Sequence, residues 1–313
     1  MLSFENVSKR FVRRLDAIER LARRLGANVS EHTVHAVDRV SFEVAKGEVV
    51  GLVGESGCGK STVGRLACGL HEPTEGRVRF DGTKRAIQMI FQDPFASLNP
   101  RMRVREIVGE APRVHGLVDA SGVDDYVAGL LQQVGLDPAM RDRYPHQFSG
   151  GQRARIGIAR ALAVQPAFLV CDEAVAALDV SIQAQVLNLF MDLRERLGLT
   201  YLFISHDLGV VRHLSDRVVV MYLGRIVESA QAAELYAAPN HPYTQALLAE
   251  VPRLDRRRRE FAPIRGEIPS PLAPPPGCHF HPRCPHATAR CRDTAPELKQ
   301  IANGRLSACH LNG

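Results

Sequence analysis

The stretch GESGCGKST, Gly54 to Thr62, constrains the fold of this 313-residue chain more than any other. It matches the pattern G-x-x-x-x-G-K-[ST], it follows the apolar run EVVGLV, and it opens the helical segment KSTVGRLACGL. The glycines let the backbone turn tightly, so that its N–H groups point inward at the start of a helix. The sequence therefore predicts a strand, a phosphate-binding loop and a helix in direct succession.

The same stretch supplies side chains for a nucleotide. Lys60 is expected to reach the β and γ phosphates, and the Ser61 hydroxyl is expected to hold a magnesium ion between the outer phosphates. A glycine-rich turn without a ligand is the alternative, and the strand and helix on either side argue against it. The predicted phosphate-binding residues are Gly54, Glu55, Ser56, Gly57, Cys58, Gly59, Lys60, Ser61 and Thr62.

An acidic pair follows a second apolar run, FLVC, where Asp172 and Glu173 end a predicted strand. Ligand sites in open α/β sheets gather at the carboxyl ends of strands, so both carboxylates are expected near the phosphates. We expect Asp172 to face the magnesium ion and Glu173 to orient and deprotonate the attacking water. An acidic strand end without chemistry is the alternative.

The order of the predicted elements indicates the fold class. Short alternating apolar runs from Phe4 to about Gly51 predict antiparallel strands. From Gly51 to Ser229, apolar strands alternate with helical segments, which is typical of an α/β domain with a mainly parallel sheet. Residues 13–27 predict a short amphipathic helix inserted between two strands. Prolines dominate residues 262–276, which predicts an extended linker to a second, smaller unit.

Composition excludes several classes of protein. Apolar residues make up 45% and charged residues 24% of the chain, and no stretch approaches the roughly 18 apolar residues of a membrane span. The N-terminus MLSFENVSKRF lacks the pattern of a secretory signal, so we expect a cytosolic chain with reduced thiols. The net charge of +6 permits contact with anionic lipid or nucleic acid without requiring either.

Further motifs make the chain resemble the nucleotide-binding subunit of an ATP-binding cassette (ABC) transporter. FSGGQ at 148–152 resembles the family's signature sequence, and FQD with Gln92 resembles its Q-loop. ALD, ending at Asp179, resembles the D-loop, and ISHD with His206 resembles the switch-histidine motif. In that family two cassettes meet head to tail, and ATP lies between the phosphate loop of one and the signature of the other.

The resemblance implies further residues of the nucleotide site. The signature precedes the helical segment QRARIGIARAL, so its N–H groups suit a second anion site. His206 is expected at the γ phosphate, with a hydrogen-bonded turn residue as the alternative. Phe11 is the candidate that stacks on adenine. The other implied nucleotide contacts are Gln92, Ser149, Gly150, Gly151, Gln152, Asp172 and Asp179. The catalytic set is Glu173, His206 and Gln92, and the magnesium set is Ser61, Gln92 and Asp172.

Longer matches narrow the resemblance to the ATPase subunits of dipeptide and oligopeptide importers, in particular their F-type subunit. They are FQDPFASLNPRM, RYPHQFSGGQRARIGIARAL, ALDVSIQAQVLNL and HPYTQALLAEVP. The implied fold is an α/β P-loop NTPase with an N-terminal antiparallel β-subdomain, a helical signature subdomain over about 93–165 and a small C-terminal cysteine-rich domain. The implied division is an ABC nucleotide-binding domain over 1–250 and a linker with the importer extension over 251–313.

The same resemblance implies ATP hydrolysis coupled to import of di- and oligopeptides. The implied partners are a D-type ATPase subunit in a heterodimer, two integral-membrane permease subunits and an extracytoplasmic solute-binding protein. The chain would then be peripheral, at the cytoplasmic face of the inner cell membrane. Nickel or another small solute is the alternative cargo. A soluble ABC ATPase acting on nucleic acid is a remote alternative, because the chain has one cassette and no sustained heptads, so no nucleic-acid partner is expected.

The sequence departs from the family pattern after Glu173. In DEAVAALD, Ala174 and Ala176 stand where the family usually has proline and then serine or threonine. Without the fixed φ of proline, the turn loses a restraint. Every residue type that contacts phosphate is still present, so we expect hydrolysis to persist.

Four cysteines mark the C-terminal stretch, at the spacing C-x5-C-x6-C-x17-C. Similar importer subunits hold a [4Fe-4S] cluster in this extension, so the resemblance implies one here, and four thiolates are its usual ligand set. Zinc bound by cysteine and histidine, or unligated thiols, are the alternatives. A segment this small and proline-rich buries little core, so we expect the centre to hold it together. The implied ligands are Cys278, Cys284, Cys291 and Cys309.

Overall fold

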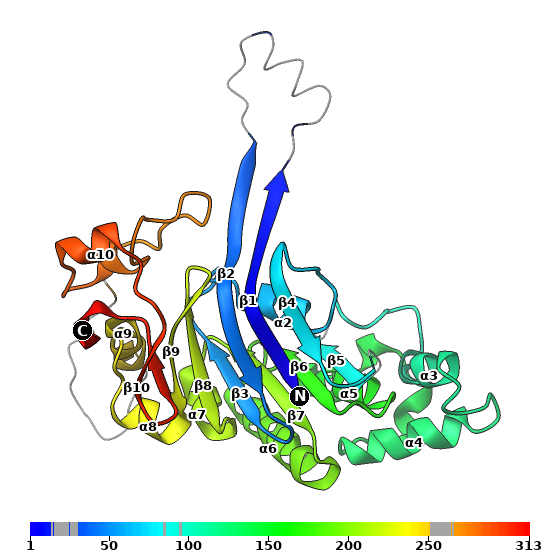
Figure 1. The fold of residues 1–313 in the computed structure, drawn as a ribbon. Coiled ribbons are helices and arrows are strands. Elements are labelled where there is room, and N and C mark those ends of the chain that lie inside the picture. Colours follow the sequence, from blue (N-terminus) through cyan, green and yellow to red (C-terminus); the bar gives the residue numbers. More distant parts are fainter. Residues whose placement is uncertain are drawn as a thin grey trace.

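The computed structural model of the chain describes residues 1–13, 15, 25, 31–83, 86–93, 96–250, 264 and 266–313. Its main sheet has the strand order β10-β11-β9-β8-β3-β7-β6-β5 (Figure 1). Neighbours from β8 to β5 pair in parallel, and β9, β11 and β10 continue the sheet with antiparallel pairing. The strands are β3 (Val49–Val53), β5 (Ile87–Ile90), β6 (Phe168–Asp172), β7 (Thr200–Ser205), β8 (Arg217–Tyr222), β9 (Arg225–Gln231), β10 (Lys299–Ala302) and β11 (Arg305–Ser307).

The central strands of this sheet are buried along their whole length. Every residue of β3, β6 and β7 is buried, which explains why their sequences are continuous apolar runs and do not alternate. The expected α/β fold with a mainly parallel sheet is confirmed. Strands β8 and β9 form a hairpin with its turn at Leu223 and Gly224.

A second, antiparallel sheet has the order β2-β1-β4 and consists of β1 (Leu2–Arg13), β2 (His32–Val44) and β4 (Glu75–Phe80). This confirms the N-terminal antiparallel subdomain. The ribbon of β1 and β2 extends well beyond the main sheet (Figure 1). Phe4 and Phe42 stack across this ribbon with ring centroids 4.7 Å apart. The helix expected over 13–27 lies mostly outside the described residues, and Arg13 is the last residue of β1.

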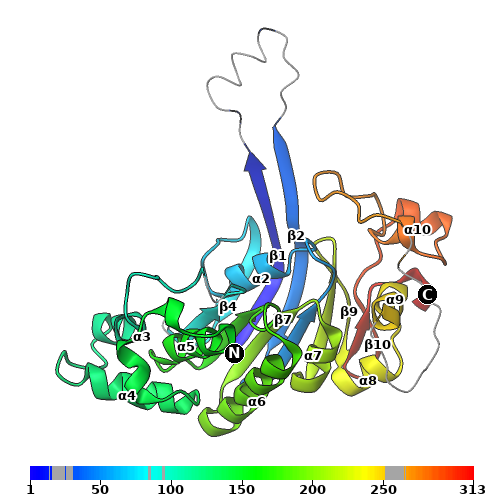
Figure 2. The ribbon, with the colours of Figure 1, turned by 180° about the vertical axis from the view of Figure 1, so that it is seen from behind.

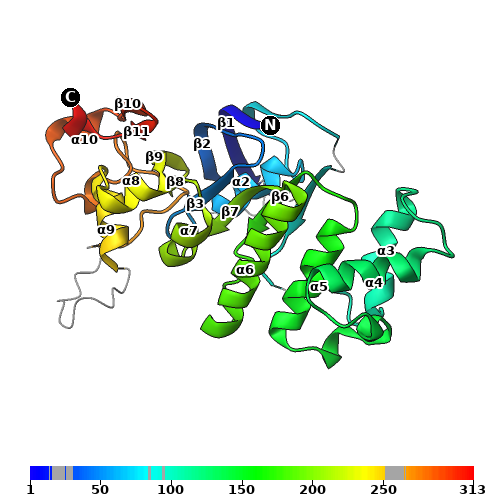
Figure 3. The same cartoon turned by 90° about the horizontal axis from the view of Figure 1, so that it is seen from below.

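The antiparallel ribbon and α2 lie on one face of the main sheet, and α6 and α7 cover the other, as Figure 2 shows from behind. Figure 3 shows α3, α4 and α5 at one end of the molecule and α8, α9 and α10 at the opposite end. The domain boundaries near 93, 165 and 250 remain predictions. The helices are α2 (Lys60–Ala67), α3 (Val104–Val114), α4 (Val123–Gln133), α5 (Gly150–Leu162), α6 (Val180–Leu197), α7 (Leu208–Leu214), α8 (Ala232–Ala237), α9 (Pro242–Glu250) and α10 (Ala289–Asp293). Among the described residues, none of these helices is both long and apolar enough to span a bilayer.

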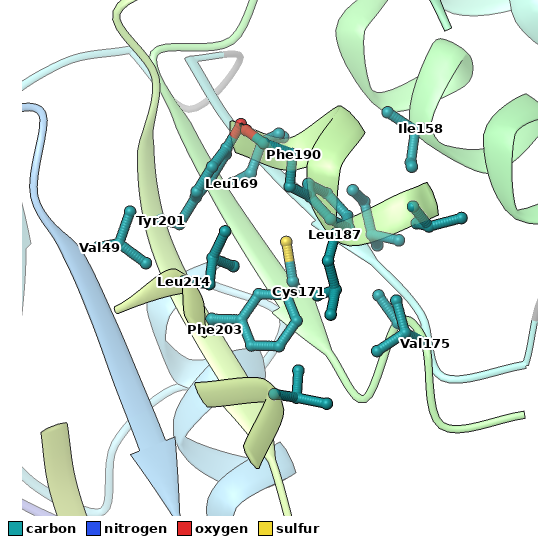
Figure 4. Close-up of a cluster of buried hydrophobic side chains, with 14 of the residues drawn as sticks. Val49, Ile158, Leu169, Cys171, Val175, Leu187, Phe190, Tyr201, Phe203 and Leu214 are labelled. Atoms are coloured by element: carbon teal, nitrogen blue, oxygen red, sulfur yellow. Dashed lines mark hydrogen bonds between the residues drawn. The ribbon is translucent and has the colours of Figure 1, made fainter. Parts of the chain in front are cut away.

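The apolar face of α6 forms the centre of the larger core. Figure 4 shows Leu187 and Phe190 of this helix grouped with Cys171 and Phe203 of the neighbouring strands. The Phe190 ring lies edge-on to Phe203 with centroids 5.9 Å apart, a favourable geometry for aromatic pairs. The Tyr201 hydroxyl donates a hydrogen bond of 2.9 Å to the Phe190 carbonyl, so this buried hydroxyl is satisfied. This packing holds β6 and β7, whose ends carry the acidic pair and the switch-histidine motif, in fixed register.

The C-terminal segment is joined to the same sheet and core. Its strand β11 pairs with β9, at Leu306 with Ser229 and at Ser307 with Glu228. Phe280 is 2% exposed and belongs to the main core cluster. The structure therefore does not confirm a separate cysteine-rich domain. An apolar anchor and an added pair of strands connect this segment to the cassette.

The predicted iron–sulfur cluster is wrong for this structure. Within the described residues, which include Cys278, Cys284, Cys291 and Cys309, no three His, Cys, Asp or Glu side chains are grouped so that they could hold a metal ion. The zinc alternative has no site there for the same reason. Burial raises the pKa of the Cys278 thiol to about 11, and it raises the pKa of Cys284 and Cys309 as well. The segment is held by packing, and the sequence reading failed because cysteine spacing carries no information on where the thiols point.

Because His241 is buried, we expect the folded chain to lose stability in mild acid. Its side chain is 1% exposed, its Nδ1 accepts the Tyr243 N–H at 3.0 Å, and burial lowers its pKa from 6.5 to about 4. Between pH 6.5 and 4 the unfolded state binds more protons than the folded state, so stability falls as the pH drops through that window. His241→Asn keeps an acceptor at the start of α9 and cannot titrate. We expect the free energy of unfolding of this variant to fall by about 2 kcal/mol less than that of the wild type between pH 8 and pH 5. Urea denaturation at the two pH values measures the difference, and equal losses in both proteins would exclude the effect.

Candidate functional site

The predicted strand, loop and helix are present: β3 ends at Val53 and α2 begins at Lys60. Gly54 has φ +154° and Gly59 has φ +107°. A Cβ atom at Gly54 would lie 2.1 Å from the Met221 carbonyl oxygen, and one at Gly59 would lie 2.1 Å from the Ala36 carbonyl oxygen. Both positions therefore exclude any larger residue, because the loop runs against neighbouring backbone and because L side chains rarely adopt such φ values.

Lys60 places a buried ammonium group inside this loop. The residue is 4% exposed, and its Nζ donates to the carbonyl oxygens of Gly54 at 2.7 Å and Glu55 at 3.0 Å. Backbone carbonyls neutralise only part of its charge. A buried cation at the N-terminus of a helix favours an anion such as phosphate.

A cavity of about 380 Å³ lies over the loop and brings together residues from distant parts of the chain. Its apolar members are Phe11, Val34, Ala36 and Pro271, and Gln92 and Glu173 line it as well. Phe11 is 37% exposed, and its ring also packs edge-on against His71 with centroids 5.3 Å apart. The loop contributes Ser56, Gly57, Gly59, Lys60, Ser61 and Thr62. This cavity has an apolar part for a base and a loop for phosphates.

Three residues of the predicted phosphate-binding set do not line this cavity, namely Gly54, Glu55 and Cys58. Gly54 forms the bend behind the loop. Cys58 is 3% exposed, its Sγ lies 3.9 Å from the Lys60 Nζ, and burial raises the pKa of its thiol. Glu55 turns its side chain toward the C-terminal segment, where Arg283 binds it.

Ser61 and Asp172 lie together beneath the loop. The Ser61 hydroxyl donates a hydrogen bond of 2.9 Å to Oδ1 of Asp172. Burial raises the pKa of Asp172, although this hydrogen bond opposes the shift. A hydroxyl and a carboxylate at this distance are hard oxygen donors of the kind that Mg²⁺ prefers. The donor set therefore fits a magnesium ion that also binds substrate phosphates.

Glu173 is held between two side chains that come from other strand ends. Gln92, after β5, donates its Nε2–H to Oε2 of Glu173 at 2.7 Å. His206, after β7, places Nδ1 3.2 Å from Oε1 of Glu173. Glu173 itself has φ +48° and donates its backbone N–H to the Ile204 carbonyl at 2.9 Å. A non-glycine residue in this strained conformation needs such fixation by its surroundings. The structure thus brings the three predicted catalytic residues together.

The turn after Glu173 is closed without the proline that the family usually has. The Ala176 N–H donates to the Glu173 carbonyl at 3.0 Å, and the Leu178 N–H donates to the Val175 carbonyl at 3.2 Å. Ala174 and Val175 are 5% and 2% exposed. Hydrogen bonds and burial restrain this turn, so the restraint that proline would supply is replaced by packing.

The signature residues begin α5, away from the cavity over the phosphate loop. Ser149 caps the helix: its Oγ accepts the Gln152 N–H at 3.3 Å, and Oε1 of Gln152 accepts the Ser149 N–H at 3.0 Å. Asp179 occupies the equivalent position before α6. None of the signature residues lines the cavity that contains Lys60, so within one chain the structure does not bring the two predicted anion sites together.

Sequence reasoning missed several neighbours of the site. Pro271 and Val34 line the cavity, and Arg283 and Tyr243 bind the loop residue Glu55. Pro271 and Arg283 follow the cassette by many residues and lie in segments without a local motif. Only the fold places them here. A sequence signal near Arg283 is Phe280, an aromatic residue three positions before it in FHPRC.

Comparisons with known proteins agree with this geometry. Residues 37–176 match the ABC transporter family, and residues 227–291 match the C-terminal region of oligopeptide/dipeptide transporters. The oligopeptide transport ATP-binding protein AppF of Bacillus subtilis (strain 168) is 53% identical over 295 residues, which cover 89% of this chain and 90% of that protein. A putative peptide import ATP-binding protein of Brucella ovis, BOV_A0347, is 52% identical over 88% of this chain and 92% of its own length.

A solved structure supports the fold. The dimeric ATP-binding cassette MJ0796, bound to ADP and Pi in a post-hydrolysis state, superimposes with a TM-score of 0.62 at 26% identity and covers 74% of this chain and 99% of its own. The two relatives named above cover both the cassette and the C-terminal segment of this chain. The chain has a phosphate loop, an acidic pair and a signature sequence in one fold. The chain therefore belongs to the ABC transporter ATP-binding proteins and is an ATPase of that family.

Proposed function

We propose that this chain hydrolyses ATP to energise the import of di- and oligopeptides, as one of two ATPase subunits on a membrane permease. The observation that carries the proposal is the contact of Glu173 with both Gln92 and His206 at the cavity that also contains Lys60. That cavity thus combines a phosphate site with a carboxylate held in place to take a proton. The C-terminal match to oligopeptide/dipeptide transporters supports peptide as the cargo.

In the proposed site, ATP lies along the cavity with its phosphates on the loop. Phe11 stacks on adenine, and Lys60 binds the β and γ phosphates. Ser61, Asp172 and Gln92 would hold a Mg²⁺ ion, which would supply positive charge to neutralise the phosphates. Glu173 orients the attacking water and accepts its proton, and His206 contacts the γ phosphate.

The position of the signature supports a dimer of cassettes. Ser149 and its neighbours form a helix start that is remote from the cavity of their own chain, so a second cassette would have to supply the signature for each ATP. We propose that this second cassette is a D-type ATPase subunit. The remaining partners are two permease subunits and an extracytoplasmic solute-binding protein. The chain would then be peripheral to the membrane, at its cytoplasmic face.

Reconstitution tests the proposal. Proteoliposomes that contain both ATPases and both permeases are expected to take up a labelled tripeptide when MgATP and the solute-binding protein are present. The combined change of Lys60→Ala and Ser149→Ala should lower uptake by about 100-fold or more, because it removes contacts at both anion sites. Lys46→Ala with Ser121→Ala, two exposed positions, is the matched control. Uptake at the wild-type rate by the double variant would refute the proposal. Uptake of nickel in place of the tripeptide would refute peptides as the cargo.

A further inference from the structure

An ion pair connects the C-terminal segment to the phosphate loop. Arg283 donates from both terminal nitrogens to the Glu55 carboxylate, at 2.7 Å and 2.9 Å, and the two residues are 228 positions apart in the sequence. Arg283 is 8% exposed. A bidentate pair between a guanidinium and a carboxylate fixes orientation as well as distance. The loop residue Glu55 is therefore held by a residue outside the cassette motifs.

Aromatic rings beneath the ion pair hold Arg283 in place. Its guanidinium lies 5.9 Å from the ring centroid of Tyr222. That ring packs edge-on against Tyr243 at 4.6 Å and Phe280 at 5.2 Å. All three rings are nearly or fully buried, so Arg283 packs against a rigid aromatic cluster.

A second bond from this cluster reaches the backbone of the same loop residue. The Tyr243 hydroxyl accepts the Glu55 N–H at 2.9 Å. Glu55 is thus fixed at its side chain by Arg283 and at its backbone by Tyr243. Its carbonyl oxygen in turn accepts a hydrogen bond from the Lys60 Nζ at 3.0 Å. One residue therefore connects the C-terminal segment to the lysine of the phosphate site.

The same segment contacts the nucleotide cavity at another point. The Pro271 carbonyl accepts the His35 N–H at 3.0 Å, and Pro271 lines the cavity opposite the loop. His279 Nδ1 lies 2.9 Å from the Leu223 carbonyl, in the turn whose Gly224 N–H donates to the Cys58 carbonyl of the loop. The C-terminal segment therefore contacts β2 and the turn between β8 and β9, and that turn is bonded to the loop.

We infer that Arg283 is a positioning residue for nucleotide binding: through Glu55 it sets the conformation of the phosphate loop, so that the C-terminal segment is required for full affinity for nucleotide. The inference deepens the proposed function and rests on the placement of ATP on this loop. Arg283 does not line the cavity that would hold the nucleotide. It acts on both ATP and ADP, because the loop holds the phosphates that the two share.

Nucleotide binding to the full-length chain tests the inference. Arg283→Met keeps the length and apolar contacts of the side chain and removes its charge and donors. We expect the Kd for MgATP and for MgADP, measured by titration calorimetry, to rise about 10-fold or more, as for the loss of a buried charged hydrogen bond. Arg283→Lys keeps the charge and should recover part of the affinity. Arg292→Met, an exposed arginine of α10, is the matched control and should bind within twofold of the wild type.

A positioning role for Arg283 predicts separate effects on KM and kcat, which a purely structural role would not. In the assembled transporter, Arg283→Met should raise KM for ATP while kcat stays within about twofold, because the catalytic carboxylate is untouched. Glu55→Gln breaks the same ion pair from the loop side and should raise the Kd as well, and the Glu55→Gln and Arg283→Met double variant should bind no more weakly than Arg283→Met alone.

The outcomes are separable from those of the proposed function. Failure of the wild-type chain to bind MgATP would overturn the proposed function. Wild-type binding together with an unchanged Kd in both Arg283→Met and Glu55→Gln would overturn only the inference. If Arg283→Met does not fold, Glu55→Gln decides: an unchanged Kd overturns the inference, and a rise of about 10-fold supports it.

Discussion

Glu173→Gln is expected to lower kcat for ATP hydrolysis by about 10²- to 10³-fold in the assembled transporter, because general-base catalysis contributes on that scale. The substituted amide has the same shape, and its oxygen can still accept the bond of 2.7 Å that Gln92 donates. It cannot take a proton from water. The arrangement of the site is therefore kept while its basic group is lost.

Binding of nucleotide should remain in this variant. We expect the Kd for MgATP to stay within about threefold of the wild type, because Glu173 lies beside the phosphate loop and not within it. Single-turnover hydrolysis and equilibrium binding measure the two quantities separately. Glu195→Gln, an exposed glutamate of α6, is the matched control. Hydrolysis at the unmutated rate would exclude Glu173 as the base.

Lys60→Ala has the second large effect, on binding. Lys60 is 4% exposed and its ammonium is bonded to the carbonyls of Gly54 and Glu55, so removing it leaves a phosphate site without its cation. A buried ammonium binds a phosphate more strongly than a neutral hydrogen-bond donor does. We therefore expect the Kd for MgATP to rise about 100-fold or more.

This loss should be specific to nucleotide. Lys46→Ala removes an exposed lysine that lies outside the cavity and should leave the Kd unchanged. The melting temperature of Lys60→Ala without nucleotide should stay within a few degrees of the wild type, whereas the stabilisation that MgATP gives the wild type should disappear. Retention of that stabilisation would contradict the role assigned to Lys60.

Local sequence patterns determined the elements that carry the site. The run before Gly54 predicts β3 because continuous apolar residues suit a strand buried on both faces. Glycines at 54 and 59 are required by φ values that other residues avoid. Ser149 and Gln152 predict the start of α5 because a capping box is satisfied within four residues. Each of these features depends on neighbours in the chain, so each can be read from a short stretch.

The sequence failed where the answer depends on residues far apart. The resemblance to importer subunits implied a metal centre at the four cysteines, yet packing of Phe280 and pairing of β11 with β9 hold that segment. The contacts of Glu173 with Gln92 and His206 could be expected only from resemblance, because strand order decides which loops meet.

The sequence by itself determined the phosphate loop, the acidic strand end and the signature helix, since local φ values, capping and hydrophobic period act within a few residues. Only the tertiary structure decided that Arg283 and Tyr243 hold Glu55, and that Pro271 borders the nucleotide cavity. The physical reason is that such contacts depend on how whole elements pack on the sheet, and packing is a property of distances in space that no local pattern encodes.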